Sequence, residues 1–237
     1  MKELSHRRTL LWDLDHTVGD FRGMRTGVLN PEVAEPIKLR YGMHELLNEL
    51  SEENGYRHFI TSSANLGYIG EALRKTHLDR KFSEVYGNDT VRQTATGKHY
   101  KEIVKGVSAE EIQANMLVIG DSDRDKPLDV GGMVFLELGL SEEPVEALVI
   151  REIVTNILEN GDGKFADGFK ALYDRADQVH SSETDEHGSR RIDIGNDIAF
   201  TMEYRKAEEI ADPEEQLIPV VCKISADSHR KPYQPFF

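Results

Sequence analysis

LLWDLDHTVGD, residues 10–20, is a hydrophobic run that ends in acids. Its Leu and Trp residues predict a buried β-strand, because a central strand of a sheet is covered on both faces. Asp13 and Asp15 stand two residues apart, so on an extended chain their side chains point to the same side. Trp12 points to the opposite side, and we expect it in the hydrophobic core. Two carboxylates this close repel each other unless a cation or a proton compensates them.

Polar side chains follow two other hydrophobic runs in the same way. HFITSS contains Thr61 and Ser62, and VIGDSDRD contains Asp121 and Asp125. Strand-like and helix-like segments alternate here, which predicts an α/β fold: a parallel sheet with helices on both faces. The carboxyl ends of parallel strands meet at one edge, so we expect these polar groups in one crevice. The expected strands are 9–15, 56–61, 82–89, 115–125 and 133–139, and the expected helices are 42–54, 68–78 and 99–107, with a capped turn at 108–112.

The pattern changes near residue 142. Amphipathic helices are expected over 144–160 and 165–179, and a polar loop or disordered segment over 180–191. Alternating hydrophobic residues then predict strands in 191–207, with a turn or bulge at Gly195-Asn196, and in 215–226. We therefore divide the chain into a catalytic core, 1–141, and an appended C-terminal helix-and-hairpin module, 142–237. The role of this module is left open, and the tail, 224–237, is expected to pack on its own domain.

The composition narrows the class of protein. The 237 residues include 29 Lys and Arg against 43 Asp and Glu, a net charge of −14. This charge disfavours non-specific binding to nucleic acid or to an anionic membrane. No window approaches the roughly 20 apolar residues of a membrane span. Cys222 is the single cysteine, which excludes an internal disulfide and agrees with a cytoplasmic location.

The strand-end acids favour a magnesium site. Hard cations such as Mg²⁺ prefer carboxylate and carbonyl oxygens, and His16 is the only histidine near these acids, so Mg²⁺ fits better than Zn²⁺. Thr61 adds a hydroxyl, and Lys98 and Lys101 supply cations, so that a phosphate group can be held. A carboxylate beside a phosphate can attack phosphorus and form an aspartyl phosphate. A second carboxylate can protonate the leaving oxygen and then activate water.

Three motifs in this order resemble those of the haloacid dehalogenase (HAD) superfamily of aspartate-nucleophile phosphohydrolases. They are Asp-Leu-Asp-His-Thr at 13–17, the hydrophobic strand that ends at Thr61, and Gly-Asp-Ser-Asp-Arg-Asp at 120–125. The resemblance covers about residues 8–140 and does not extend to the C-terminal module. It implies a Rossmann-like three-layer core with a parallel sheet.

The resemblance also implies a role for each motif residue. Asp13 would be the nucleophile and Asp15 the general acid and base. Phosphate would be bound by Thr61 and Ser62 and by a lysine, for which we favour Lys98 over Lys101. The second Asp of the first motif points to a phosphatase or a phosphomutase rather than a dehalogenase. The implied Mg²⁺ site is formed by Asp13, the backbone carbonyl of Asp15, Asp121 and Asp125.

Members of this superfamily select substrates largely through a cap domain. Only about forty residues separate Asp15 from the strand at 56–61, and there is no room for a large insert between Asn65 and Gly120. The sequence therefore predicts little or no cap and an open site. Such a site suits bulky phosphorylated substrates, including macromolecules, unless the C-terminal module or a partner in a homo-oligomer covers it.

Three functions are consistent with these residues. The first is a Mg²⁺-dependent phosphomonoester hydrolase. The second is a phosphomutase, which shares every motif but needs a closed site that excludes water. The third is a scaffold or binding protein, in which a HAD core presents the C-terminal module to a partner. The complete set of motifs favours the hydrolase.

Overall fold

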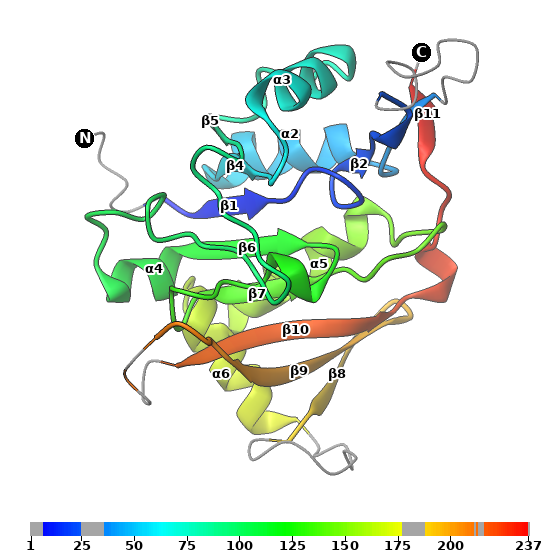
Figure 1. Cartoon of the computed structure of the whole chain (residues 1–237). Coiled ribbons are helices and arrows are strands. Elements are labelled where there is room, and N and C mark those ends of the chain that lie inside the picture. Colours follow the sequence, from blue (N-terminus) through cyan, green and yellow to red (C-terminus); the bar gives the residue numbers. More distant parts are fainter. Residues whose placement is uncertain (1–6, 25–35, 177–187, 211, 213–215, 237) are drawn as a thin grey trace.

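The computed structural model describes residues 7–24, 36–176, 188–210, 212 and 216–236. An eight-stranded sheet runs through the molecule in the order β5-β4-β1-β6-β7-β10-β9-β8 (Figure 1). The first six strands of this order are parallel, and the last two pair antiparallel. The strands are β1 (Thr9–Trp12), β4 (Arg57–Thr61), β5 (Glu84–Tyr86), β6 (Met116–Gly120), β7 (Val134–Glu137), β8 (Arg190–Gly195), β9 (Ile198–Lys206) and β10 (Leu217–Ser225).

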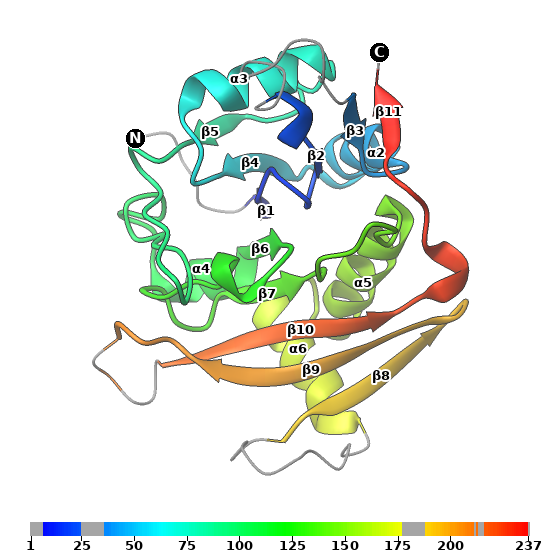
Figure 2. The same cartoon turned by 45° about the vertical axis from the view of Figure 1, so that its right-hand side comes forward.

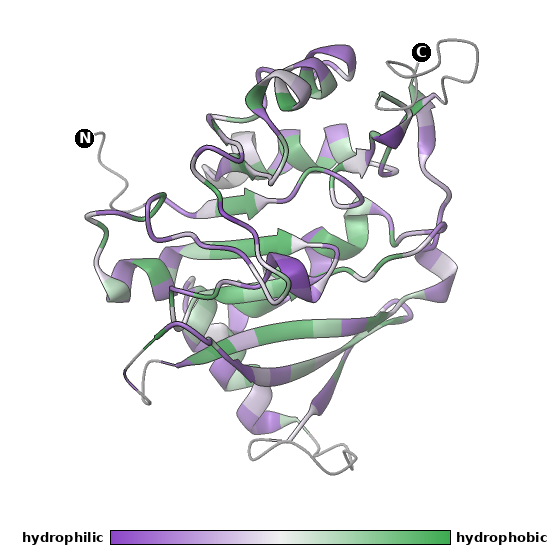
Figure 3. Ribbon diagram, viewed as in Figure 1, coloured by the Kyte–Doolittle hydropathy of each residue, from purple (hydrophilic) through white to green (hydrophobic). Residues whose placement is uncertain are grey.

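Helices cover both faces of the sheet, so the predicted Rossmann-like three-layer architecture is confirmed. Four helices pack with Trp12 and its neighbours on one face, while α4 and the segment around Tyr100 pack with Leu11 on the other. Trp12 is fully buried, as expected. Figure 3 shows that the central strands β6 and β10 are predominantly hydrophobic. The helices are α2 (Met43–Asn54), α3 (Leu66–Lys75), α4 (Ala109–Asn115), α5 (Ala147–Asn160) and α6 (Phe165–Arg175).

The C-terminal helices and hairpin are present as predicted. The hairpin of β8 and β9 turns at Asn196 and Asp197, both of which have positive φ. Strand β10 returns to pair with β7, so the C-terminal strands continue the sheet of the N-terminal part (Figure 2). The division at residue 141 stays a prediction; the two parts share one sheet and one hydrophobic cluster. Of the expected loop at 180–191, residues 180–187 lie outside the described residues.

The helix expected over 99–107 is wrong. This segment forms successive turns, because Tyr100 is drawn into the core and its hydroxyl donates to the carbonyl of Asp125 at 3.0 Å. Gly106, with φ of 83°, breaks any helical continuation. The helix forms instead at Ala109–Asn115, where Ser108 and Glu111 complete the capping box that their spacing suggests.

A second, small sheet places the C-terminus beside the loop that follows β1. Its order is β11 (Gln234–Phe236), β3 (Ile37–Leu39) and β2 (Gly19–Asp20). Figure 2 shows β11 beside β3, away from strands β8, β9 and β10. The end of the tail therefore packs on the N-terminal part of the chain, and the expectation that it packs on its own domain is wrong. Among the helices of the described residues, none has the length and hydrophobicity that a membrane crossing requires.

Candidate functional site

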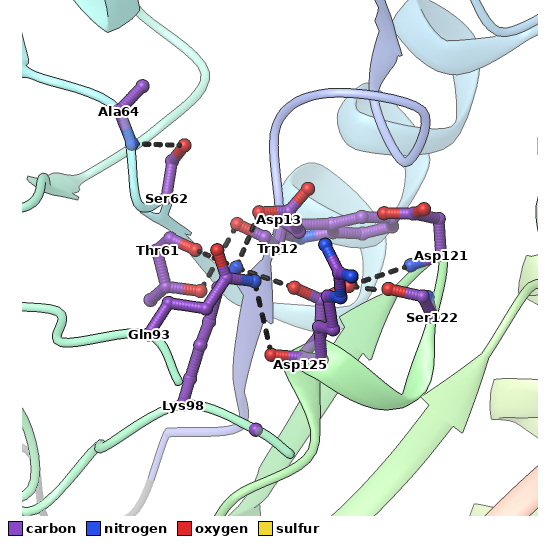
Figure 4. Close-up of polar contacts among 12 residues, drawn as sticks. Trp12, Asp13, Thr61, Ser62, Ala64, Gln93, Lys98, Asp121, Ser122 and Asp125 are labelled. Atoms are coloured by element: carbon purple, nitrogen blue, oxygen red, sulfur yellow. Dashed lines mark hydrogen bonds and ion pairs between the residues drawn. The ribbon is translucent and has the colours of Figure 1, made fainter. Parts of the chain in front are cut away.

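Three carboxylates converge where β1 and β6 end. Asp13 follows β1, and Asp121 and Asp125 follow β6, the strand paired with β1. They offer oxygen atoms within 4.8 Å of one another, and all three residues are buried. Figure 4 shows them facing one another across the two strand ends. The sequence thus located these acids correctly, because parallel neighbours end at the same edge of the sheet.

Lys98 is the cation that the fold brings to these acids. Its Nζ lies 2.5 Å from Asp13 Oδ1 and 2.6 Å from Asp125 Oδ1, and it donates to the carbonyl of Thr61 at 3.0 Å (Figure 4). The side chain is fully buried. Lys101 is exposed and lines a different cavity, beside α4. The preference for Lys98 therefore agrees with the placement of the two lysines.

Two glycines allow the close approaches that this arrangement needs. A Cβ on Gly120 would lie 2.3 Å from the Cβ of Asp125, so only glycine lets the loop fold back onto the end of β6. A Cβ on Gly97 would lie 2.4 Å from the carbonyl of Lys126. Without it, the backbone N–H of Lys98 bonds that same carbonyl at 2.8 Å. The glycine before each of Asp121 and Lys98 is thus a steric requirement of the site.

Burial and mutual repulsion make the acids reluctant to ionise. Burial raises the pKa of Asp13 well above its usual range, although the Lys98 charge opposes the rise. Burial, with the charge of Asp125, raises the pKa of Asp121 to about 7. Burial alone would lower the pKa of Lys98, but the charges of Asp13 and Asp125 raise it. The cluster thus holds more negative charge than one lysine compensates.

The structure supplies a test of whether a metal ion fits. Both oxygens of Asp125 are engaged: Oδ1 by Lys98, and Oδ2 by the backbone N–H groups of Asp121 and Ser122 at 3.1 and 3.3 Å. Asp13 and Asp121, in contrast, both have a raised pKa, chiefly because burial disfavours the ionised form and also because of the charge of Asp125. A divalent cation on oxygen ligands fits this donor set, because it stabilises both carboxylates in the ionised form. Through its bonds to Lys98 and to the backbone of Asp121 and Ser122, Asp125 fixes the position of Lys98 and of the loop after β6.

Asp15 lies apart from this cluster in its side-chain contacts. Its Oδ1 accepts a hydrogen bond of 2.8 Å from the hydroxyl of Tyr68, which lies in the first turn of α3. Its neighbour His16 has a positive φ of 65° and turns the chain out of the strand. The two acids of the first motif therefore have different surroundings: Asp13 faces a lysine, and Asp15 a phenol.

Thr61 and Ser62 lie at the end of β4, beside β1. The Thr61 hydroxyl donates to the carbonyl of Trp12 at 3.3 Å, and Ser62 Oγ accepts from the N–H of Ala64 at 3.1 Å (Figure 4). Asn65, not Thr61, caps α3. Both residues are thus beside the end of β1, and both hydroxyls are engaged with backbone groups.

Sequence reasoning missed the residues that hold the loop after Asp15. Arg40 is fully buried and donates to three carbonyls: Thr17 at 2.6 Å, His16 at 2.7 Å and Val145 at 2.6 Å. The hydroxyl of Tyr233, from the tail, donates to the His16 carbonyl at 2.7 Å. No local pattern marks either residue, because each acts on a segment far away in the sequence.

A cavity of ≈ 940 Å³ adjoins this loop. Arg22, at its wall, forms a two-pronged pair with Asp20, with bonds of 2.9 and 2.8 Å. The tail contributes Pro232 and Tyr233 to the wall. Arg25, the other arginine of this loop, lies outside the described residues. The lining residues are His16, Asp20, Arg22, Lys38, Leu140, Ser141, Glu142, Pro232 and Tyr233.

A segment of the chain that includes most of these site residues matches a known family. Residues 24–127 match the family described as "Haloacid dehalogenase-like hydrolase". The matched range includes Thr61, Lys98, Asp121 and Asp125, whereas the first motif precedes it. No curated protein matches the chain at a significant level.

Several solved structures are similar to this chain. An uncharacterized protein from Listeria monocytogenes serotype 4b is 15% identical, with 57% of this chain and 83% of that chain covered and a TM-score of 0.42. A HAD-superfamily hydrolase of subfamily IA from Geobacter sulfurreducens is 15% identical, with 55% and 89% covered and a TM-score of 0.40. A haloacid dehalogenase-like family hydrolase from Xanthomonas campestris is 12% identical, with 56% and 83% covered and a TM-score of 0.41.

Proposed function

Because residues 24–127 match the family of haloacid dehalogenase-like hydrolases, we propose that the chain is a magnesium-dependent phosphomonoester hydrolase working through a phosphorylated Asp13. One observation carries the proposal. Lys98 Nζ bridges Asp13 and Asp125 at 2.5 and 2.6 Å, and Asp121 shares the same buried cluster. A buried lysine between two acids at a strand end is the arrangement that a doubly charged phosphate group needs beside a carboxylate nucleophile.

In the first step, a carboxylate oxygen of Asp13 attacks phosphorus. Asp13 Oδ1 already accepts from Lys98, so this bond orients the carboxylate and leaves Oδ2 to react. A bond forms between Oδ2 and phosphorus as the bond from phosphorus to the ester oxygen breaks. Asp15 gives its proton to the departing oxygen, so the product leaves as an alcohol.

In the second step, Asp15 takes a proton from water and the water oxygen attacks phosphorus. The bond between phosphorus and Asp13 breaks, inorganic phosphate forms, and the Asp13 carboxylate is restored. Tyr68, which donates to Asp15 at 2.8 Å, orients this carboxylate through both steps.

Asp13 and Asp121, with the backbone carbonyl of Asp15, would hold Mg²⁺, and Asp125 would fix the loop and Lys98. When bound, Mg²⁺ supplies positive charge that keeps Asp13 ionised and offsets the charge of the phosphate. Thr61 and Ser62 would bind the phosphoryl oxygens once their hydroxyls rotate away from the backbone groups they now contact. Lys101 has no part in this scheme, because it is exposed beside α4.

The substrate is a phosphate monoester whose organic part lies in the cavity beside His16. Its volume, ≈ 940 Å³, is large enough for a small-molecule leaving group. The alternative substrate is a phosphorylated macromolecule, which could reach the site if little or no cap covers it. The relative activities on small molecules and on phosphopeptides distinguish the two. The proposed location is the cytoplasm, where the single cysteine, Cys222, would stay reduced.

The experiment that tests the function measures phosphate release with Mg²⁺ and with EDTA. The substrates are p-nitrophenyl phosphate and a panel of phosphorylated metabolites, nucleotides and phosphopeptides. We expect turnover with Mg²⁺ only, and a loss of at least ~10³-fold in Asp13→Asn, because the nucleophile is removed. Asp79→Asn, an exposed acid away from the cluster, is the matched control and should keep full activity. Full activity of Asp13→Asn would contradict the proposal.

A further inference from the structure

Arg205, in the last third of the chain, contacts the loop that carries the proposed metal ligands. It lies on β9, and β10 separates this strand from β7. Its Nη1 lies 2.8 Å from Asp123 Oδ1 and 2.6 Å from Glu137 Oε2, and its guanidinium also contacts Glu203 Oε1 at 2.6 Å. The Arg205 side chain is 23% exposed. Three carboxylates from three segments therefore share one largely buried guanidinium.

The positions of these carboxylates connect Arg205 to the metal site. Asp123 begins the 3-10 turn Asp123–Asp125 and so lies between Asp121 and Asp125 in the sequence. Glu137 is the register partner of Gly120, the residue just before Asp121. Arg205 thus joins the turn to the strand beside it, on the outer side of the carboxylate cluster.

A guanidinium suits this task better than an ammonium does. Nη1 bridges Asp123 and Glu137, while Nε and Nη2 both contact Glu203 Oε1, so the planar guanidinium holds three carboxylates in a fixed relative position. It also stays charged at every physiological pH. Lys126 Nζ, at 3.6 Å from Asp123 Oδ2, is a longer and weaker contact. Asp123 is half exposed, with 52% of its side chain accessible, so the turn would be held loosely at this point without Arg205.

We propose that Arg205 is a positioning residue for the metal site: it fixes the turn after Asp121, and the C-terminal strands are thereby part of the catalytic unit. The inference rests on the proposed function, and it assigns a role to residues 142–237, which lie beyond the range matched by the family. Residues that orient metal ligands from outside typically contribute 10–100-fold to metal affinity.

The test measures magnesium affinity by isothermal titration calorimetry on the full chain, with thermal unfolding of the metal-free protein alongside. Arg205→Gln removes the charge, and Asp123→Asn breaks the same contact from its exposed side. Arg191→Gln, an exposed arginine on β8, is the matched control. We expect roughly 10–100-fold weaker magnesium binding in Arg205→Gln and in Asp123→Asn. The double variant should bind magnesium no more weakly than Arg205→Gln alone, because Asp123→Asn removes a contact that Arg205→Gln has already removed.

Each outcome decides the matter. Wild-type magnesium affinity in Asp123→Asn and Arg205→Gln would overturn the proposal, as would a wild type that binds no magnesium. If Arg205→Gln does not fold, Asp123→Asn alone decides, since its exposed side chain should tolerate the change. Arg205→Lys should recover only part of the affinity, because an ammonium has no further nitrogens to hold Glu203 while one nitrogen bridges Asp123 and Glu137. Full recovery would count against positioning. A wild type that binds magnesium but hydrolyses no phosphoester would refute the proposed function and leave this inference standing.

Discussion

The parallel and antiparallel parts of the sheet differ in what they contribute to the site. The parallel strands β1, β4 and β6 end at one edge, so the acids and hydroxyls that follow them gather there. The antiparallel strands β8 and β9 have no such common edge. They supply Arg205, which contacts the loop after β6 from the side. Reactive groups thus sit on short local motifs, while the groups that hold them come from distant segments.

The largest effect is expected where the two kinds of group meet, at Lys98. Lys98→Met leaves Asp13 and Asp125 as buried acids without their cation, which costs about 3–5 kcal/mol of stability. Activity should fall by at least ~10²-fold, because a charged donor to the reacting group is lost. Phosphate release and denaturant unfolding check both numbers.

Lys101→Met is the control that makes this comparison sharp. Lys101 lies three residues away and is exposed, so the free energy of unfolding should stay within about ±0.5 kcal/mol of wild type. The activity should stay at the wild-type level. Equal losses in the two variants would show that the fold does not select between the lysines.

A second effect concerns the charge of the carboxylate cluster and its dependence on pH. The pKa of Asp121 in the folded chain is raised to about 7, above its value in the unfolded chain. Its contribution to stability is therefore fully present below pH ~4 and is lost as the pH rises through about 7. Asp121→Asn cannot ionise, so the metal-free variant should not lose this stability at pH 8. Its melting temperature should be roughly 2–4 °C above that of wild type for each ~1 kcal/mol of unfolding free energy gained.

The same variant should lose its response to magnesium. Mg²⁺ should raise the melting temperature of wild type more at pH 8 than at pH 5.5, since metal and protons compete for Asp121. Asp121→Asn should show little magnesium stabilisation at either pH. Thermal unfolding at the two pH values, with and without Mg²⁺, checks this; stabilisation by Mg²⁺ that persists in the variant would place the ion elsewhere.

The smallest effect is expected at the tail. Tyr233→Phe removes one of two donors to the His16 carbonyl, and Arg40 remains as the other. We expect a loss of ~0.5–1.5 kcal/mol of stability, the net contribution of one hydrogen bond. The KM for a substrate that fills the cavity should rise more than kcat falls, because Tyr233 lines that cavity.

Tyr41→Phe, at an exposed tyrosine, is the control and should change neither stability nor KM. If Tyr233→Phe behaves as Tyr41→Phe does in both measurements, the Tyr233 hydroxyl contributes neither to stability nor to substrate binding. A loss larger than that of Lys98→Met would reverse the order of the comparison between motif residues and supporting residues.

Much of the fold was predictable because the signals are local. The acids, the hydrophobic runs before them and the alternation of strands with helices predicted both the parallel sheet and the edge where Asp13 and Asp121 meet. The error over 99–107 has a cause that is only partly local, because Tyr100 bonds a carbonyl 25 residues away. Its helical spacing was real, but Tyr100 and the positive φ of Gly106 impose turns.

The sequence by itself thus determined which groups can react, because a strand places its last side chains according to the residues within it. Only the tertiary structure buries Lys98 beside the acids and leaves Lys101 exposed, since burial depends on what the rest of the chain packs over a residue. It alone brought Arg40, Tyr233 and Arg205 to the two loops, through contacts that span between 23 and 217 residues of sequence. Such contacts leave no periodic or spacing signal in the sequence, because the two partners become neighbours only when the chain folds.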